Sequence, residues 1–111
     1  MPHDEHIRHS QLYLMAQGAH RDSSRWFGHY PATQTLPNQV LCLAGEVGEL
    51  ANLVKKIVRG DFTLDEKREE VENEVADIFT YFLCIAGLLE IDPQWVYERK
   101  HVLNEARFGR E

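Results

Sequence analysis

Cysteine is scarce in this 111-residue chain, and long apolar runs are missing. The two cysteines, Cys42 and Cys84, both fall in segments of helical pattern. They form no disulfide framework, so a reducing compartment is expected. No apolar run is long enough to span a membrane, and the segment MPHDEHIRHS lacks the apolar core of a signal peptide. These absences predict a cytoplasmic protein with no membrane partner.

Basic residues are also in the minority. The chain has 12 Lys and Arg against 18 Asp and Glu, for a formal net charge of −6. Nucleic-acid backbones attract clustered Lys and Arg, so a nucleic-acid partner is not expected. The length is enough for one compact domain, and residues 1–111 are predicted to form that single domain.

The sequence shows no strand alternation, internal repeat or low-complexity tract, and the predicted fold class is all-α. A first helix is expected from Asp4 to about Gly18, followed by a structured loop from His20 to Leu36. A second helix is expected to begin with Pro37 at its first position, where the missing N–H costs nothing, and to stop at Gly60.

Two further helices have clear starting signals. Thr63 and Glu66 have the spacing of a capping box, which predicts a helix from Thr63 to about Glu90. Asp92 followed by Pro93 is typical of an N-cap and a first helical position, and predicts a helix that runs toward Phe108.

Two pairs of carboxylates lie in the most apolar part of the chain, Glu46 with Glu49 and Glu74 with Asp77. Residues three apart on a helix share a face, so each pair points one way. At 100° per residue, Glu46 and Glu74 fall inside the apolar sectors of their helices, while Glu49 and Asp77 fall on the edges. Ionised carboxylates on a core-facing stripe are costly unless paired or metal-bound. A hard divalent cation such as Mg²⁺, which prefers oxygen ligands, would neutralise them.

The second and third helices carry more apolar surface than a lone four-helix monomer can cover. Large exposed apolar patches usually mark interfaces, and a symmetric dimer is the simplest way to bury them. We therefore expect a four- to five-helix bundle whose core is completed by a homodimer or homotetramer. The apolar stripe of the second helix consists of Val40, Leu43, Ala44, Val47, Leu50, Ala51, Val54 and Val58.

The pattern Glu-x-x-Glu, a spacer and Glu-x-x-Asp resembles the MazG-type nucleotide pyrophosphohydrolases, an all-α family. LAGEVGELANLVKKIVRGD is similar to the short, phage-type members, and the resemblance covers about Trp26 to Phe108. It implies hydrolysis of a nucleoside triphosphate to the monophosphate and pyrophosphate, for house-cleaning or nucleotide-pool control. The metal implied is Mg²⁺, with Mn²⁺ as a substitute. Its ligands would be the four motif acids, and Glu49 is the residue we expect to act as general base.

The resemblance also implies residues that bind the substrate. Basic residues after the second motif acid and a C-terminal Lys/Asn/Arg group would hold phosphates, and the segment RWFGHYP resembles an aromatic-and-His element that packs on a base. Some deoxycytidine-type relatives carry a Trp where this chain has Lys55 and Lys56, which leaves the base preference open. The expected substrate-binding residues are Lys55, Lys56, Lys100, Asn104, Arg107, Trp26 and His29.

Three other functions are compatible with parts of the sequence. A pyrophosphohydrolase acting on another diphosphate, such as phosphoribosyl-ATP, fits the same residues. A di-iron bundle needs two Glu-x-x-His motifs, and the chain has only Glu98 with His101, so this alternative is discounted. A non-catalytic helical dimerisation module explains the apolar stripes but leaves Glu46 and Glu74 unexplained.

Overall fold

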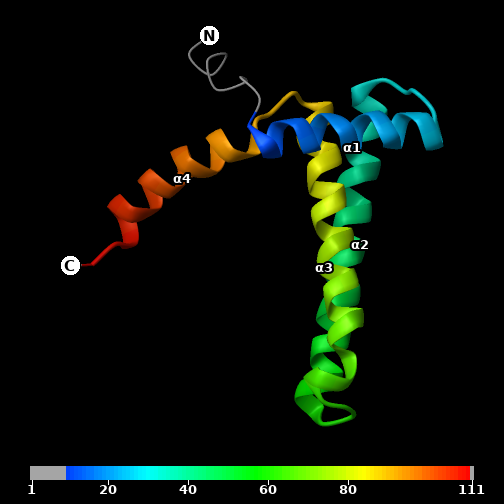
Figure 1. Ribbon diagram of the computed structural model, residues 1–111, viewed down its shortest axis with the longest axis vertical. Coiled ribbons are helices and arrows are strands. Elements are labelled where there is room, and N and C mark those ends of the chain that lie inside the picture. Colours follow the sequence, from blue (N-terminus) through cyan, green and yellow to red (C-terminus); the bar gives the residue numbers. More distant parts are fainter. Residues whose placement is uncertain (1–9, 111) are drawn as a thin grey trace. The chain divides into compact units, whose positions relative to one another are not determined.

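The computed structural model describes residues 10–110, and these form α-helices joined by short connections (Figure 1). The helices are α1 (Gln11–Phe27), α2 (Ala32–Arg59), α3 (Leu64–Leu88) and α4 (Pro93–Phe108). No strand occurs among the described residues, so the all-α prediction is confirmed. None of these helices is long and apolar enough to cross a membrane.

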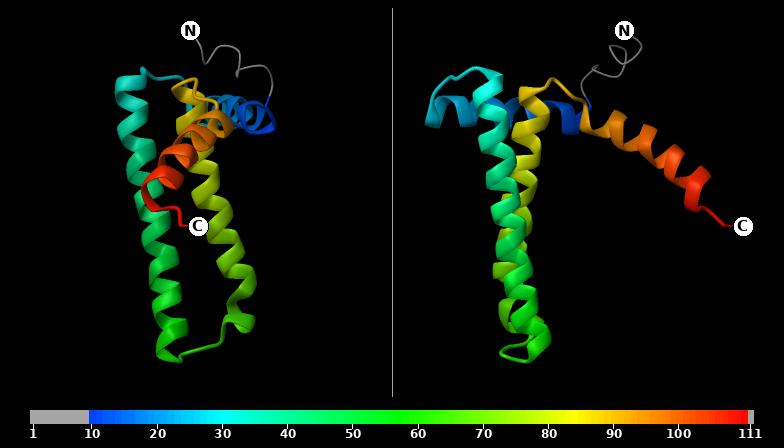
Figure 2. Two further views of the ribbon diagram at one scale, coloured as in Figure 1. Left: turned by 90° about the vertical axis from the view of Figure 1, so that its left-hand side faces the viewer. Right: turned by 180° about the vertical axis from the view of Figure 1, so that it is seen from behind.

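The chain divides into two compact units that share α3. One unit, residues 30–82, contains α2 and the larger part of α3, and these two helices run antiparallel and side by side (Figure 2). The described part of the other unit, residues 10–29 and 83–110, contains α1, the end of α3 and α4.

The turn between α2 and α3 follows the sequence prediction. Gly60 ends α2 with a left-handed φ of 95°, and its N–H donates to the carbonyls of Ile57 and Lys56. At the start of α3, the Thr63 N–H donates to Glu66 Oε1, and the Glu66 N–H donates to Thr63 Oγ1. This reciprocal pair is the capping box expected from the sequence.

The predicted start of α2 was wrong. The helix begins at Ala32, and Pro37 lies inside it, beyond the first turn. The carbonyl of Pro31 accepts from the N–H groups of Gln34 and Thr35 at 2.9 and 3.0 Å, which anchors the extra turn. Pro37 has no N–H, so α2 gives up one intrahelical hydrogen bond there.

The predicted limits of α1 and of the loop after it were also wrong. Residues 20–27, expected in a loop, continue the helix to Phe27, and residues 4–9 of the expected helix lie outside the described residues. The glycine that ends α1 is Gly28, with a φ of 102° and its N–H bonded to the Ser24 carbonyl. Gly18 lies within the helix, because packing of α1 outweighs its low helix propensity.

The packing of α1 against the end of α3 forms the buried apolar cluster of this unit. Ala16, Leu83 and Ala86 are 0%, 6% and 3% exposed, and Ala19 and Ile91 pack against them. Gly87 lies so close to Ala16 that an added Cβ would overlap the Ala16 carbonyl group. Small side chains on both helices therefore let the two backbones approach each other.

The start of α4 confirms its prediction. Asp92, 5% exposed, accepts from the Gln94 N–H at 3.0 Å, and Pro93 occupies the first turn. Ser10, the N-cap of α1, donates its hydroxyl hydrogen to Asp92 at 2.7 Å. The N-termini of α1 and α4 thus meet at one hydrogen bond.

Much of the apolar surface of α2 and α3 stays exposed in the single chain. Val40, Val47 and Val54, spaced seven residues apart on α2, are 47%, 47% and 42% exposed. On α3, the rings of Phe79 and Phe82 stack 6.0 Å apart, and both remain about two-fifths exposed. This is the surface for which the sequence predicts a covering partner.

Candidate metal centre

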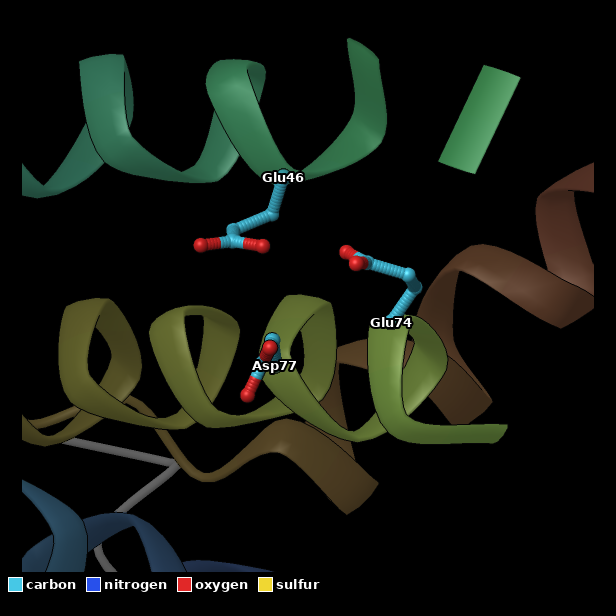
Figure 3. Close-up of side chains that lie close together, drawn as sticks. All are labelled: Glu46, Glu74 and Asp77. Carbon is cyan, nitrogen blue, oxygen red and sulfur yellow. The ribbon is translucent and has the colours of Figure 1, made fainter. Parts of the chain in front are cut away.

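Three of the four predicted acids converge between α2 and α3. One carboxylate oxygen from each of Glu46, Glu74 and Asp77 lies within 4.8 Å of the other two. In Figure 3 the Glu46 and Glu74 side chains both enter the space between the two helices, and Asp77 lies further along α3. The antiparallel pairing of α2 and α3 therefore brings together residues that are 28 or more positions apart in the sequence.

The two central acids are half-buried. Glu46 Oε2 and Glu74 Oε2 are enclosed, and neither has a hydrogen-bond partner, whereas Asp77 and Glu49 are exposed. This order agrees with the helix-phase prediction, which put Glu46 and Glu74 inside the apolar sectors. A buried carboxylate oxygen without a partner is costly, so the site favours a bound cation.

The electrostatics of Glu46 point the same way. Its pKa is raised above the ordinary value, first by burial and then by the charges of Glu49 and Asp77 and the adjoining Glu74 carboxyl. Like charges close together disfavour ionisation of each other. A cation beside Glu46 would reverse that effect and favour the ionised form of Glu46.

Glu49 lies beside the cluster, and its carboxylate is not one of the three that converge. It lies one turn after Glu46 on α2 and is exposed, and its charge contributes more than any other to the raised pKa of Glu46. Its side chain is thus close enough to act on Glu46 electrostatically while remaining open to solvent.

The donor set fits a hard divalent cation. Every group in the cluster offers carboxylate oxygen, and two of the oxygens are buried and unpartnered. Mg²⁺ prefers oxygen ligands and is usually held by few carboxylates together with waters and substrate phosphates. Glu46, Glu74 and Asp77 would supply such ligands, and the exposed side of the cluster would leave room for phosphate.

The predicted lysines lie on the same helix as Glu46. Lys55, exposed, and Lys56, half-buried, are in the last turns of α2.

Glu70, an acid one turn before Glu74 on α3, is exposed and forms an ion pair with Lys67 at 3.3 Å. The contacts of Glu70 therefore support a surface role and not a place among the converging acids.

The remaining predicted substrate-binding residues lie in the other unit and on its exposed surface. On α4, Lys100, Asn104 and Arg107 are all exposed. Trp26, at the end of α1, is 64% exposed; its ring meets Phe27 edge-on and lies 5.7 Å from the Arg25 guanidinium. His29 is exposed in the connection to α2.

One buried polar residue on the same helix as Glu46 was missed in the sequence. Gln39, on α2, is only 7% exposed. It lies seven residues before Glu46, a spacing that returns to the same helix face. The available signal was a long polar side chain in phase with Glu46 amid apolar residues.

The architecture and the cluster define an all-α protein in which carboxylate oxygens from two helices converge. The MazG nucleotide pyrophosphohydrolase domain matches residues 34–101, a range that includes all four motif acids. The chain belongs to this family, as the sequence resemblance predicted, and membership implies a nucleotide pyrophosphohydrolase. Comparison with curated proteins and with solved structures gave no match.

Proposed function

We propose that this protein hydrolyses nucleoside triphosphates, as ribo- or deoxyribonucleotides, to the monophosphate and pyrophosphate with the aid of Mg²⁺. The observation that carries the proposal is the convergence of Glu46, Glu74 and Asp77 within 4.8 Å, with two oxygens buried and unpartnered. Family membership supplies the pyrophosphohydrolase class, and the oxygen-only donor set supports the choice of metal.

The proposed reaction breaks one phosphoanhydride bond. The oxygen of water bonds to the α-phosphorus, the bond from that phosphorus to the oxygen bridging to the β-phosphorus breaks, and pyrophosphate leaves. Bound Mg²⁺ would neutralise phosphate charge and make the attacking water more acidic. Glu46, Glu74 and Asp77 would bind the ion through their carboxylate oxygens. Glu49, exposed beside them, orients the water and accepts its proton.

Phosphate charge also calls for cationic side chains. Lys55 and Lys56 supply two on α2, and the exposed face of α4 offers Lys100, Asn104 and Arg107. We propose that these α4 residues act on the site of a second copy of the chain, and that Trp26 and His29 contact the base. The exposed aromatic ring of Trp26 suits stacking on a nucleobase.

The apolar stripe of α2 supports the same assembly. Val40, Val47 and Val54 are each more than two-fifths exposed on one face of the helix. A second copy that covers this face would give a homodimer or homotetramer with the more apolar interface typical of obligate oligomers. On this proposal the two units, joined through the continuous helix α3, act as one domain.

The experiment that tests the proposed function is a substrate panel with Mg²⁺ or Mn²⁺. All common NTPs and dNTPs, with phosphoribosyl-ATP as an additional substrate, are incubated and assayed separately for pyrophosphate and orthophosphate. Release of pyrophosphate from at least one triphosphate is expected. Activity on phosphoribosyl-ATP alone would show that the protein is a pyrophosphohydrolase for the other substrate class. If no substrate is hydrolysed, only a binding or dimerisation role remains.

A further inference from the structure

The amide of Gln39 is the buried polar group of the α2–α3 unit that the acid cluster does not explain. Its side-chain oxygen is enclosed and has no hydrogen-bond partner. In this unit, the only other described side-chain atoms in that condition are the Glu46 and Glu74 oxygens. Burying an amide oxygen without a partner destabilises the protein, so a ligand that donates a hydrogen bond to Gln39 would remove that cost.

Gln39 is placed on the side of the acids toward which a substrate can extend. Seven residues of α-helix rise about 10 Å and turn almost twice, so Gln39 and Glu46 lie on one face of α2. Helical side chains lean toward the helix N-terminus, and the Glu46 side chain follows this rule in Figure 3. A nucleotide whose phosphates lie at the carboxylates can therefore direct its nucleoside along α2 toward Gln39.

We propose that the Gln39 amide binds the nucleoside part of the substrate and accepts a hydrogen bond from it. This inference rests on the proposed function and names a determinant of its specificity. The donor is an N–H or O–H group beyond the α-phosphate, which means an exocyclic amino group or a ring N–H of the base, or a hydroxyl of the sugar. A buried polar group discriminates well, because an analogue without the matching donor leaves it unpaired again.

The test uses Gln39→Met, which keeps length and bulk but removes the acceptor, with Gln34→Met as the matched control. Gln34 is an exposed glutamine on the same helix and is not part of the proposed site. Substrates are compared in pairs that differ in the donors they present. In dCTP/dUTP and dATP/dITP the exocyclic amino group of the first member is exchanged for a ring N–H in the second, which tests the base, and each NTP with its dNTP tests the sugar hydroxyl.

The wild type is expected to favour the member of one pair whose donor meets Gln39 by about tenfold in kcat/KM, the effect of one hydrogen bond. Gln39→Met should reduce that preference to near unity, mainly by raising KM for the favoured substrate, and Gln34→Met should retain it. Without nucleotide, Gln39→Met should unfold at no lower a urea concentration than the wild type, because the removed oxygen has no partner among residues 10–110.

Three results would overturn the inference. One is an unchanged preference in Gln39→Met. Another is the absence of any donor preference in the wild type. The third is a lower unfolding midpoint or a changed oligomer mass in Gln39→Met, which would show that the amide pairs with protein. If the wild type hydrolyses no nucleotide, the proposed function fails by itself, and the same pairs are then compared by calorimetric binding with Mg²⁺ to decide the role of Gln39.

Discussion

Ser10 donates a hydrogen bond of 2.7 Å to a carboxylate oxygen of Asp92, and each of the two residues also caps its own helix. The Ser10 hydroxyl oxygen accepts from the Tyr13 N–H at the start of α1. The same Asp92 oxygen accepts from the Gln94 N–H at the start of α4. The two helix starts are thus linked through side chains 82 positions apart in the sequence.

The first prediction concerns this linked pair of caps. Ser10→Ala should lower the free energy of unfolding by about 1 kcal/mol, and Asp92→Ala by a similar or larger amount, because each removes a cap. The double variant should lose less than the sum, since both changes remove the one shared hydrogen bond. Urea unfolding measures all three. Ser24→Ala, inside α1, is the control, and strict additivity would mean that the caps are independent.

The second prediction concerns the acids in turnover. Asp77→Asn and Glu49→Gln should each abolish pyrophosphate release while circular dichroism shows an intact helical fold. Each change preserves side-chain shape but removes a negative charge that would bind metal or accept a proton. Glu69→Gln, an exposed acid on α3, should keep full activity. Near-normal turnover by either variant at saturating Mg²⁺ would place the site elsewhere.

The third prediction concerns the charge repulsion in the metal-free protein. Glu46→Gln should raise the unfolding temperature when EDTA is present, because it removes one of several crowded negative charges. Mg²⁺ at about 100 times its Kd should stabilise the wild type by about 2.7 kcal/mol. It should stabilise Glu46→Gln less. Calorimetric scans with EDTA and with Mg²⁺ compare the two, and equal stabilisation of both proteins by Mg²⁺ would show that Glu46 does not bind the ion.

The pH dependence of that difference has a definite sign. The pKa of Glu46 is raised in the folded state, so this group binds more protons folded than unfolded over the interval between its two pKa values. Its contribution to stability is therefore fully present below the unfolded pKa and is lost as pH rises through the folded pKa. The advantage of metal-free Glu46→Gln over the wild type should accordingly shrink as the solution is acidified through that interval.

The fourth prediction concerns assembly. The wild type should be at least dimeric by light scattering at micromolar concentration. Val54→Lys should shift it toward the monomer, because a charge on an apolar contact surface is costly to bury. Asn52→Lys adds the same charge to an exposed position of the same helix and should leave the mass unchanged. A wild-type monomer with full activity would refute the proposed interface.

The parts predicted well from the sequence are those determined by nearby residues. The capping box of Thr63 and Glu66 and the Asp92–Pro93 start require partners only two or three residues away, and both form as expected. The phase of Glu46 on its helix also follows from local geometry, so its half-buried position could be predicted from the sequence.

The parts predicted poorly depend on distant contacts. The continuation of α1 past Gly18 goes with packing of Ala16 and Ala19 near Leu83 and Ala86, which lie far along the chain. Nothing local distinguishes Gly18 from a terminating glycine. Gln39 shares the helix phase of Glu46, which was a signal for its burial, but its lack of a hydrogen-bond partner is a property of the folded surroundings.

The contact of Gly87 with Ala16 limits how this protein can be redesigned. Because a Cβ at position 87 would overlap the backbone of α1, every other residue type should be rejected there in a library screened for folding. A Cβ added at Gly48, beside the motif acids, would meet no neighbour within 4 Å, so this position should accept alanine in the isolated chain. Stabilising substitutions are therefore better sought along α2 than at the α1–α3 crossing, where the backbone of α1 leaves no room for a side chain at position 87.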